Sequence, residues 1–189
     1  MSRFARPLAL LLTFLTGVSG LVYEITWEKA LATLLGSHAE ATAAVLALFL
    51  GGMSLGYWLW GVVTGRLTAR AASGSGALPL LRAYGILEAS IGLWALVFPL
   101  LFRALQALSG WLPQSGGGLG FAVDVLLCAL LIGPPAVMMG GTIPMLTQAL
   151  SRSIGDATRV HALIYASNTT GAFVGALAAG FWIVPALGI

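Results

Sequence analysis

The sequence predicts an all-α, polytopic membrane protein with about five transmembrane helices. Of its 189 residues, 59% are hydrophobic and 8% are charged, and its mean hydropathy is +0.97. Soluble domains carry about a quarter charged residues. The apolar runs are continuous, whereas a membrane β-barrel would alternate apolar and polar residues. We therefore expect one helical transmembrane domain over residues 1–189 and no soluble catalytic domain.

The expected spans follow one another in the order 7–31, 41–64, 80–102, 119–150 and 161–184. Residues 36–38 make a turn between the first two spans, and polar, glycine-rich loops at 65–77 and 109–118 separate the next ones. Arginines ahead of the first span would also suit a cleaved signal peptide ending near Gly20. The helix-compatible pattern continues through Leu35, so we expect a retained first helix.

Small residues mark the faces on which these helices are expected to pack. Gly52 and Gly56 in the second span are four residues apart, as are Gly171 and Gly175 in the fifth span. This spacing lets helix backbones approach closely in lipid. The second span repeats it over residues 61–65, which predicts a second close contact.

The fourth span contains prolines that predict an interruption. Pro134, Pro135 and Pro144 lack a backbone donor, and such residues kink or break helices. The run at 119–150 is long for one helix and too short for two spans with a turn. We therefore expect one interrupted span with a bend near Gly133.

Basic and aromatic residues predict the orientation of the bundle. With the N-terminus in the cytoplasm, the inner side receives Arg3, Arg6, Arg66, Arg70, Arg82, Arg152 and Arg159. Lys29 and Arg103 are left outside, which fits the positive-inside rule. Tyr57, Trp58 and Trp60 come late in the second span and suit an interfacial belt. We expect an integral protein of the bacterial inner membrane.

Two carboxylates in the first span are the strongest candidates for a binding site. Glu24 and Glu28 are four residues apart and so share one helix face, beside Tyr23 and Trp27. Ionisable groups inside a bilayer are costly, so each is by default a functional candidate. The pair could bind a small cation or a polyamine, or hold a proton. Pairing with Lys29 or Arg103 would instead make it a structural cluster.

Polar residues in the later spans are weaker candidates. Glu88 lies deep in the third span, and Arg82 is not its direct helical neighbour, so a partner must come from another span. Glu88 would then line a cavity or form a structural pair. Asn168 would supply an interhelical hydrogen bond, with a substrate contact as the alternative. Asp124 would interact favourably with the start of the fourth helix.

Several functional classes lack support in the sequence. The only cysteine, Cys128, lies mid-span, and His38 and His161 lie at span ends, so we expect no metal site. The loop glycines lack the strand and helix of a dinucleotide fingerprint, so we expect no cofactor. No clustered basic surface suits nucleic acid. We also expect no catalytic residue in the chain.

Six motifs occur in order along the chain: SGLVYEITW at 19–27, LLGSH at 34–38, ALFLGGMSLG at 47–56, YGILEA at 84–89, GGTIPML at 140–146 and YASNTTGA at 165–172. Together they resemble the membrane domain of membrane-bound spermidine synthase-like proteins, and the resemblance covers nearly the entire chain. It implies a bundle similar to half of a major-facilitator transporter. In the family, this region is fused to an aminopropyltransferase.

The resemblance implies that the family's enzyme transfers an aminopropyl group from decarboxylated S-adenosylmethionine to putrescine. That reaction would belong to a Rossmann-like soluble domain after the membrane part, where this sequence stops. The resemblance therefore gives the chain no catalytic residue. The motif positions that carry over have no assigned role, and they are Tyr23, Glu24, Trp27, Glu88, Thr142, Pro144 and Asn168.

Two functional hypotheses follow, with a truncated enzyme as a third alternative. In the first, the chain is a transporter-like membrane module that binds or moves a small cationic solute such as a polyamine. Glu24, Glu28 and Glu88 would then share one cavity. In the second, it is a non-catalytic anchor or oligomerisation scaffold for an aminopropyltransferase. A half bundle leaves polar faces unfinished, so we expect lipid contacts and either a homo-oligomer or a partner membrane chain.

Overall fold

The computed structural model describes residues 5–36, 39–71, 77–111, 118–151 and 153–188, and no strand occurs in these ranges. Its elements are α1 (Ala5–Leu35), α2 (Ala39–Ala71), α3 (Leu78–Trp111), α4 (Gly118–Leu150), α5 (Ile154–Ala178), the π-helical segment η1 (Ala179–Ile183) and α6 (Val184–Leu187). Within the described residues, five helical stretches are long and apolar enough to cross a membrane, and the fifth continues from α5 through η1 into α6. The predicted all-α fold class is confirmed.

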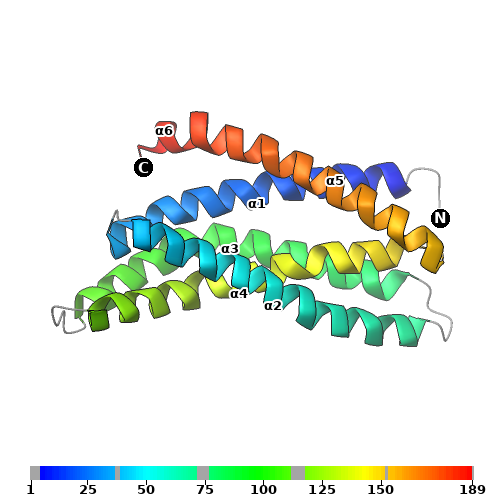
Figure 1. The fold of residues 1–189 in the computed structure, drawn as a ribbon, viewed down its shortest axis with the longest axis horizontal. Coiled ribbons are helices and arrows are strands. Elements are labelled where there is room, and N and C mark those ends of the chain that lie inside the picture. Colours follow the sequence, from blue (N-terminus) through cyan, green and yellow to red (C-terminus); the bar gives the residue numbers. More distant parts are fainter. Residues whose placement is uncertain (1–4, 37–38, 72–76, 112–117, 152, 189) are drawn as a thin grey trace.

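The long helices lie side by side and alternate in direction (Figure 1). α1 packs mainly against α5, whereas α2 and α3 both pack mainly against α4. The end of the bundle at which α1 begins also holds the end of α2 and the beginnings of α3 and α5. We call it the Arg6 end. Arg66, Arg82 and Arg159 lie toward this same end of their helices, as the charge count assumed.

The helices extend beyond most of the predicted spans. α2 continues to Ala71, so the first part of the expected loop at 65–77 is helical. α3 continues to Trp111 and includes the start of the expected loop at 109–118. The rest of these connections, part of the expected first turn and two inner-side arginines lie outside the described residues, namely 72–76, 112–117, Ser37, His38, Arg3 and Arg152.

The fifth helix begins several residues before the expected span. Ser153 is its N-cap, and its hydroxyl accepts a hydrogen bond from the backbone N–H of Asp156 at 3.2 Å. The Asp156 carboxylate pairs with Arg6 of α1, with 2.9 Å between Nη2 and Oδ2. This ion pair joins the first turns of α1 and α5. His161 consequently lies inside α5, about two turns after its start.

The prolines do not interrupt the fourth helix. α4 is one continuous helix with Pro134, Pro135 and Pro144 inside it. Pro135 has no N–H to donate to the carbonyl of Leu131 four residues earlier. The indole Nε1–H of Trp94 in α3 donates to that carbonyl instead, at 3.0 Å. A side chain from another helix thus satisfies a backbone group that would be costly to leave unpaired in lipid.

Glycines bring two helix pairs into backbone contact. A methyl group placed on Gly56 of α2 would collide with the backbone of α4, and one on Gly52 would collide with a side chain of α4. On the other pair, a methyl group on Gly171 or Gly175 of α5 would collide with the backbone of α1. The α2–α4 and α1–α5 pairs are therefore both tightly closed, and the space between the two pairs is less filled.

Candidate functional site

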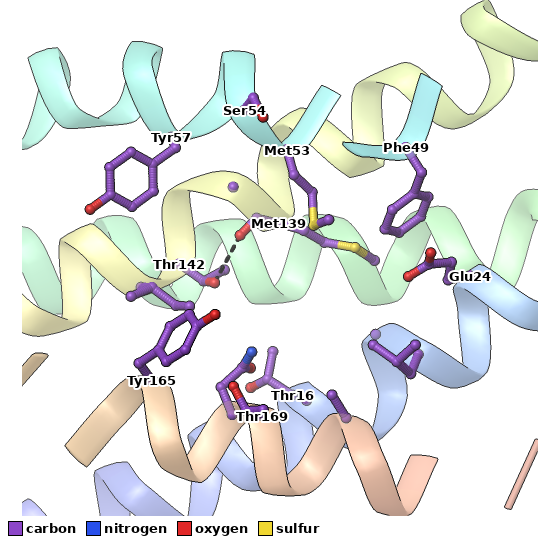
Figure 2. Close-up of a pocket in the computed structure, with 17 residues that line it drawn as sticks. Thr16, Glu24, Phe49, Met53, Ser54, Tyr57, Met139, Thr142, Tyr165 and Thr169 are labelled. Carbon is purple, nitrogen blue, oxygen red and sulfur yellow. Dashed lines mark hydrogen bonds between the residues drawn. The ribbon is translucent and has the colours of Figure 1, made fainter. Parts of the chain in front are cut away.

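A cavity of about 540 Å³ lies between the α1–α5 pair and the α2–α4 pair. Figure 2 shows side chains from all four helices converging on it. We call it the Glu24 cavity. Polar and aromatic side chains of the lining include Glu24 of α1, Phe49 and Tyr57 of α2, Thr142 of α4, and Tyr165 and Asn168 of α5.

Small residues create this space. Gly17 of α1 and Gly140 of α4 line the cavity, and each also makes a backbone contact within its own helix pair. Gly20 lines the cavity too, and a methyl group placed on it would meet no atom within 4 Å. The absence of a side chain at Gly20 therefore leaves room beside Glu24.

Glu24 has the only charged side chain among the described residues that line the cavity. It is half-buried, and it forms no hydrogen bond or ion pair with any described residue. Phe49 lines the same cavity from α2, and the face of an aromatic ring attracts cations. Because a carboxylate sheltered from water is costly without a partner, this end of the cavity favours a positively charged guest.

The opposite end of the cavity carries neutral polar groups. Figure 2 shows Tyr57, Thr142 and Tyr165 at the end away from Glu24. Along α1 the lining runs from Thr16 to Glu24, which corresponds to roughly 12 Å at the rise of an α-helix. The cavity therefore has one anionic end, a set of hydroxyl and amide groups at the other end, and the length of an extended small molecule.

Glu28 lies one turn from Glu24 but does not line the cavity. Its Oε1 accepts a hydrogen bond from Thr42 of α2 at 3.0 Å, and its Oε2 pairs with Lys29 at 3.3 Å. The structural alternative considered for Glu28 is thus the arrangement observed. The expectation that Glu24, Glu28 and Glu88 share one cavity is wrong, because α2 covers Glu28 near the α1–α2 connection.

Glu88 of α3 lies behind the Glu24 cavity in a smaller, tightly filled recess. Thr16, Thr142 and Asn168 line both spaces. The Thr16 hydroxyl lies 3.4 Å from Glu88 Oε1 and 2.7 Å from the carbonyl oxygen of Leu12. One hydroxyl has one proton to donate, and the shorter bond to Leu12 takes it. Glu88 thus lies behind a wall of side chains that Thr16, Thr142 and Asn168 share between the two spaces.

Tyr23 and Trp27 lie on a different side of α1 from the cavity. Their rings stack at 5.3 Å, and Trp27 stacks in turn on Phe98 of α3 at 4.7 Å. Trp27 is 4% exposed and belongs to the buried core where α1 to α4 meet. The structure places these two aromatic residues in a stack that joins α1 to α3, and not in the cavity lining with Glu24.

Of the polar residues of α5, Ser167 contributes to helix packing and Asn168 lines the cavity. Ser167 makes the interhelical hydrogen bond that was expected of Asn168, because its hydroxyl donates to the carbonyl oxygen of Leu10 at 2.8 Å. The Asn168 side chain forms no hydrogen bond with a described residue and lines the cavity. Asp124 of α4 accepts a hydrogen bond from Ser109 of α3 at 2.6 Å.

Several lining residues were not singled out from the sequence. Phe49, Met53 and Tyr57 recur every fourth residue along α2 and line the cavity together. Tyr57 was expected in an interfacial belt, and Trp60 was too. Trp60 donates a hydrogen bond from Nε1 to the carbonyl oxygen of Val137 in α4 at 3.0 Å. The regular spacing of large side chains next to the glycine face of α2 could have revealed this lining.

The described part of the chain contains no cluster of side chains suited to binding a metal ion. No group of three or more His, Cys, Asp or Glu residues lies close enough together there to hold an ion. Cys128 is fully buried and packs in the apolar core. The described residues that line the Glu24 cavity therefore offer one carboxylate, hydroxyls, an amide and aromatic rings.

Comparison with known proteins finds a relative that aligns with nearly the whole of this chain. The chain is 31% identical over 186 residues to polyamine aminopropyltransferase 2 of Streptomyces coelicolor. The similarity supports a spermidine synthase-like relationship. It covers 97% of this chain and 30% of the length of that relative. No protein-family model matches the chain, and no solved structure is significantly similar to it.

Proposed function

We propose that the chain is the transporter-like membrane module of a spermidine synthase-like protein, and that it binds or moves a small cationic solute such as a polyamine. The observation that carries the proposal is Glu24, a carboxylate without a protein partner among the described residues, in a cavity of about 540 Å³. A charge of this kind inside a bilayer is a functional candidate. The relative is named as an enzyme of polyamines, which supports the choice of solute.

The shape and chemistry of the cavity suit an extended diamine. One ammonium group pairs with Glu24 and lies near the ring of Phe49. The second ammonium group meets neutral acceptors at the other end, where Asn168 and Thr169 line the cavity. The alkyl chain between them packs on Met53 and Met139, whose flexible side chains adapt to apolar guests.

The test is putrescine binding to the purified protein and putrescine uptake into proteoliposomes. Glu24→Gln keeps the size of the side chain and removes its charge, so we expect affinity to fall at least about tenfold. Glu28→Gln is the matched control, because Glu28 already pairs with Lys29 and Thr42. Equal binding by the Glu24→Gln and unmodified proteins would refute the role of Glu24, and both variants must elute as folded protein.

A second candidate function is a non-catalytic anchor or oligomerisation scaffold for an aminopropyltransferase. The partial coverage of the relative favours it, since the chain corresponds to 30% of a protein named for that activity. In this case, the Glu24→Gln variant keeps all properties of the unmodified chain. Gly171 and Gly175 pack α5 against α1 within the chain, so their substitution would weaken the fold under either hypothesis.

The proposal includes the setting in which the module works. The exposed apolar side chains of α3, among them Leu93, Leu96 and Leu100, contact lipid. We place the chain in the bacterial inner membrane with the N-terminus in the cytoplasm, and we expect a homo-oligomer or a partner membrane chain to complete the bundle. Labelling of residues at the Arg6 end in intact cells and in inverted vesicles tests the orientation.

A further inference from the structure

A second cavity of about 420 Å³ lies nearer the Arg6 end of the bundle, between α2, α4 and α5. Four side chains of its lining carry the argument, namely Tyr57 and Thr64 of α2, Gln148 of α4 and His161 of α5. We call it the Thr64 cavity. Neither the sequence motifs nor the comparison with the relative gives it a role.

Glycines leave this second cavity open. Gly61 and Gly65 line it, and a methyl group placed on either would meet no atom within 4 Å. The close helix contact expected over residues 61–65 is therefore absent, in contrast to the contact at Gly56 one turn earlier. α2 packs tightly on α4 around Gly56 and faces a cavity beyond it.

The hydroxyl of Thr64 lacks a partner in the described part of the chain. Thr64 is 6% exposed, and its Oγ1 does not bond the preceding turn of α2, whereas Thr68 does bond the Thr64 carbonyl at 2.8 Å. A buried polar group without a partner is rare and calls for a water molecule or a guest that supplies one. Since Thr64 also lines the cavity, its unpaired hydroxyl lies in the wall of this space.

The other polar groups around Thr64 are hydrogen-bond donors and acceptors from α4 and α5. His161 Nδ1 lies 3.3 Å from the Thr147 hydroxyl, and the exposed amide of Gln148 lines the same space. No Lys, Arg, Asp or Glu is among the described residues of the lining. Hydroxyl oxygens, an amide oxygen and an imidazole can accept the N–H groups of an ammonium ion without holding it as strongly as a carboxylate.

Tyr57 lines both cavities. Figure 2 shows it with Tyr165 at the end of the Glu24 cavity away from Glu24. Tyr165 in turn stacks on His161 of the second cavity, with 6.3 Å between ring centroids. Along α2 the combined lining runs from Phe49 to Thr68, which corresponds to roughly 28 Å. This is close to the thickness of a hydrocarbon core, which is about 30 Å.

We propose that the two cavities form one path along α2 for a small ammonium-bearing solute, and that Tyr57 is the partition between them. Glu24 holds the solute, and the Thr64 cavity is a weaker site through which the solute reaches the Arg6 end. This inference rests on the proposed function and deepens it. It assigns Tyr57 a role in movement and predicts that the chain does more than bind.

The first test measures access without any solute. Thr64→Cys and, separately, Met139→Cys in the Glu24 cavity are treated in proteoliposomes with impermeant methanethiosulfonates, which form a mixed disulfide and release methanesulfinate. The reagents carry either a trimethylammonium or a sulfonate group and are added from the Arg6 side. The unmodified chain gives the background rate of labelling, which should be low because its cysteine, Cys128, is fully buried.

We expect both reagents to modify Thr64→Cys, because the described lining of the Thr64 cavity is polar and holds no Lys, Arg, Asp or Glu. Tyr57→Ala should raise the rate at Met139→Cys at least about fivefold and leave the rate at Thr64→Cys within about twofold. If Thr64→Cys reacts with neither reagent, or if Tyr57→Ala leaves Met139→Cys unchanged, the path is refuted. This result would stand whether or not putrescine binds.

The second test separates binding from movement. Thr64→Val keeps the shape of the side chain and removes the unpaired hydroxyl, so the folded protein should be at least as stable. We expect it to slow putrescine uptake at least about threefold while putrescine affinity at Glu24 stays within about twofold. Unchanged uptake refutes the role of the Thr64 cavity. Failure of the unmodified protein to bind putrescine would instead refute the proposed function.

Discussion

Glu24 and Glu28 lie one turn apart on α1, yet their surroundings differ. Glu28 is close to the α1–α2 connection, where Thr42 and Lys29 bind its carboxylate. Glu24 is further from the connection, where α2 packs on α4 and leaves a cavity. Helical spacing thus places two carboxylates on one face, but the course of the neighbouring helix decides which of them has a partner.

The largest effect is expected from a substitution that disturbs the packing of α1, which carries both Glu24 and Glu28. Gly175→Leu would push α5 away from α1, because even a methyl group there collides with the α1 backbone. Overpacking at such a contact should cost at least about 3 kcal/mol of stability. The measurement is thermal unfolding in detergent. Gly180→Leu is the control, since Gly180 has no neighbour within 4 Å, and an equal loss in both variants would contradict the assignment.

The next change would affect only the surroundings of Glu24. Gly20→Leu places a side chain in the Glu24 cavity without a clash, so we expect putrescine affinity to fall at least about a hundredfold, or ~2.7 kcal/mol. The melting temperature should stay close to that of the unmodified protein. Gly51→Leu on the exposed side of α2 serves as the matched control. Full affinity in the Gly20→Leu protein would place the solute elsewhere.

A third change would affect the stack beside the two carboxylates. Trp27→Ala should cost about 3 kcal/mol of stability, because it removes a buried ring between Tyr23 and Phe98. Putrescine affinity should stay within about twofold, since Trp27 does not line the cavity. Thermal unfolding and equilibrium binding measure the two effects. If a folded Trp27→Ala protein lost putrescine binding, Trp27 would have to contribute to the binding site.

The smallest effect is expected at the partners of Glu28. Lys29→Gln should change stability by less than about 1 kcal/mol, because the Lys29 side chain is 47% exposed and exposed ion pairs contribute little. Uptake should not change measurably. Thr42→Val removes the other bond to Glu28 and should behave similarly. A strong loss of uptake in either variant would show that Glu28 belongs to the functional site after all.

The sequence was sufficient for the features that depend on one helix. Continuous apolar runs predict the five long helices, and their composition requires no knowledge of neighbours. The position of Glu24 on an interior face also follows from its charge and depth. The length of α5 was missed because the cap at Ser153 precedes the apolar run, although serine at this position is a common start signal.

Features that depend on two helices were harder to predict. The spacing of Gly52 and Gly56 is the same as that of Gly61 and Gly65, but only the first pair contacts α4. Likewise, nothing local to α1 shows that Thr42 reaches Glu28. Tyr57 looks like a membrane-interface residue by sequence, and its place between two cavities depends on α4 and α5. Pairing between helices, and not helix formation, limits such predictions.

The hydrogen bond from Trp94 to the Leu131 carbonyl makes the effects of substitutions at Trp94 and Pro135 depend on each other. Trp94→Phe would leave the Leu131 carbonyl without a donor, because Pro135 cannot supply one. Pro135→Ala would restore an amide donor within α4, so the loss of the indole should be tolerated much better in the double variant. Sequence design or directed evolution of this bundle would therefore have to vary the tryptophan and the proline together.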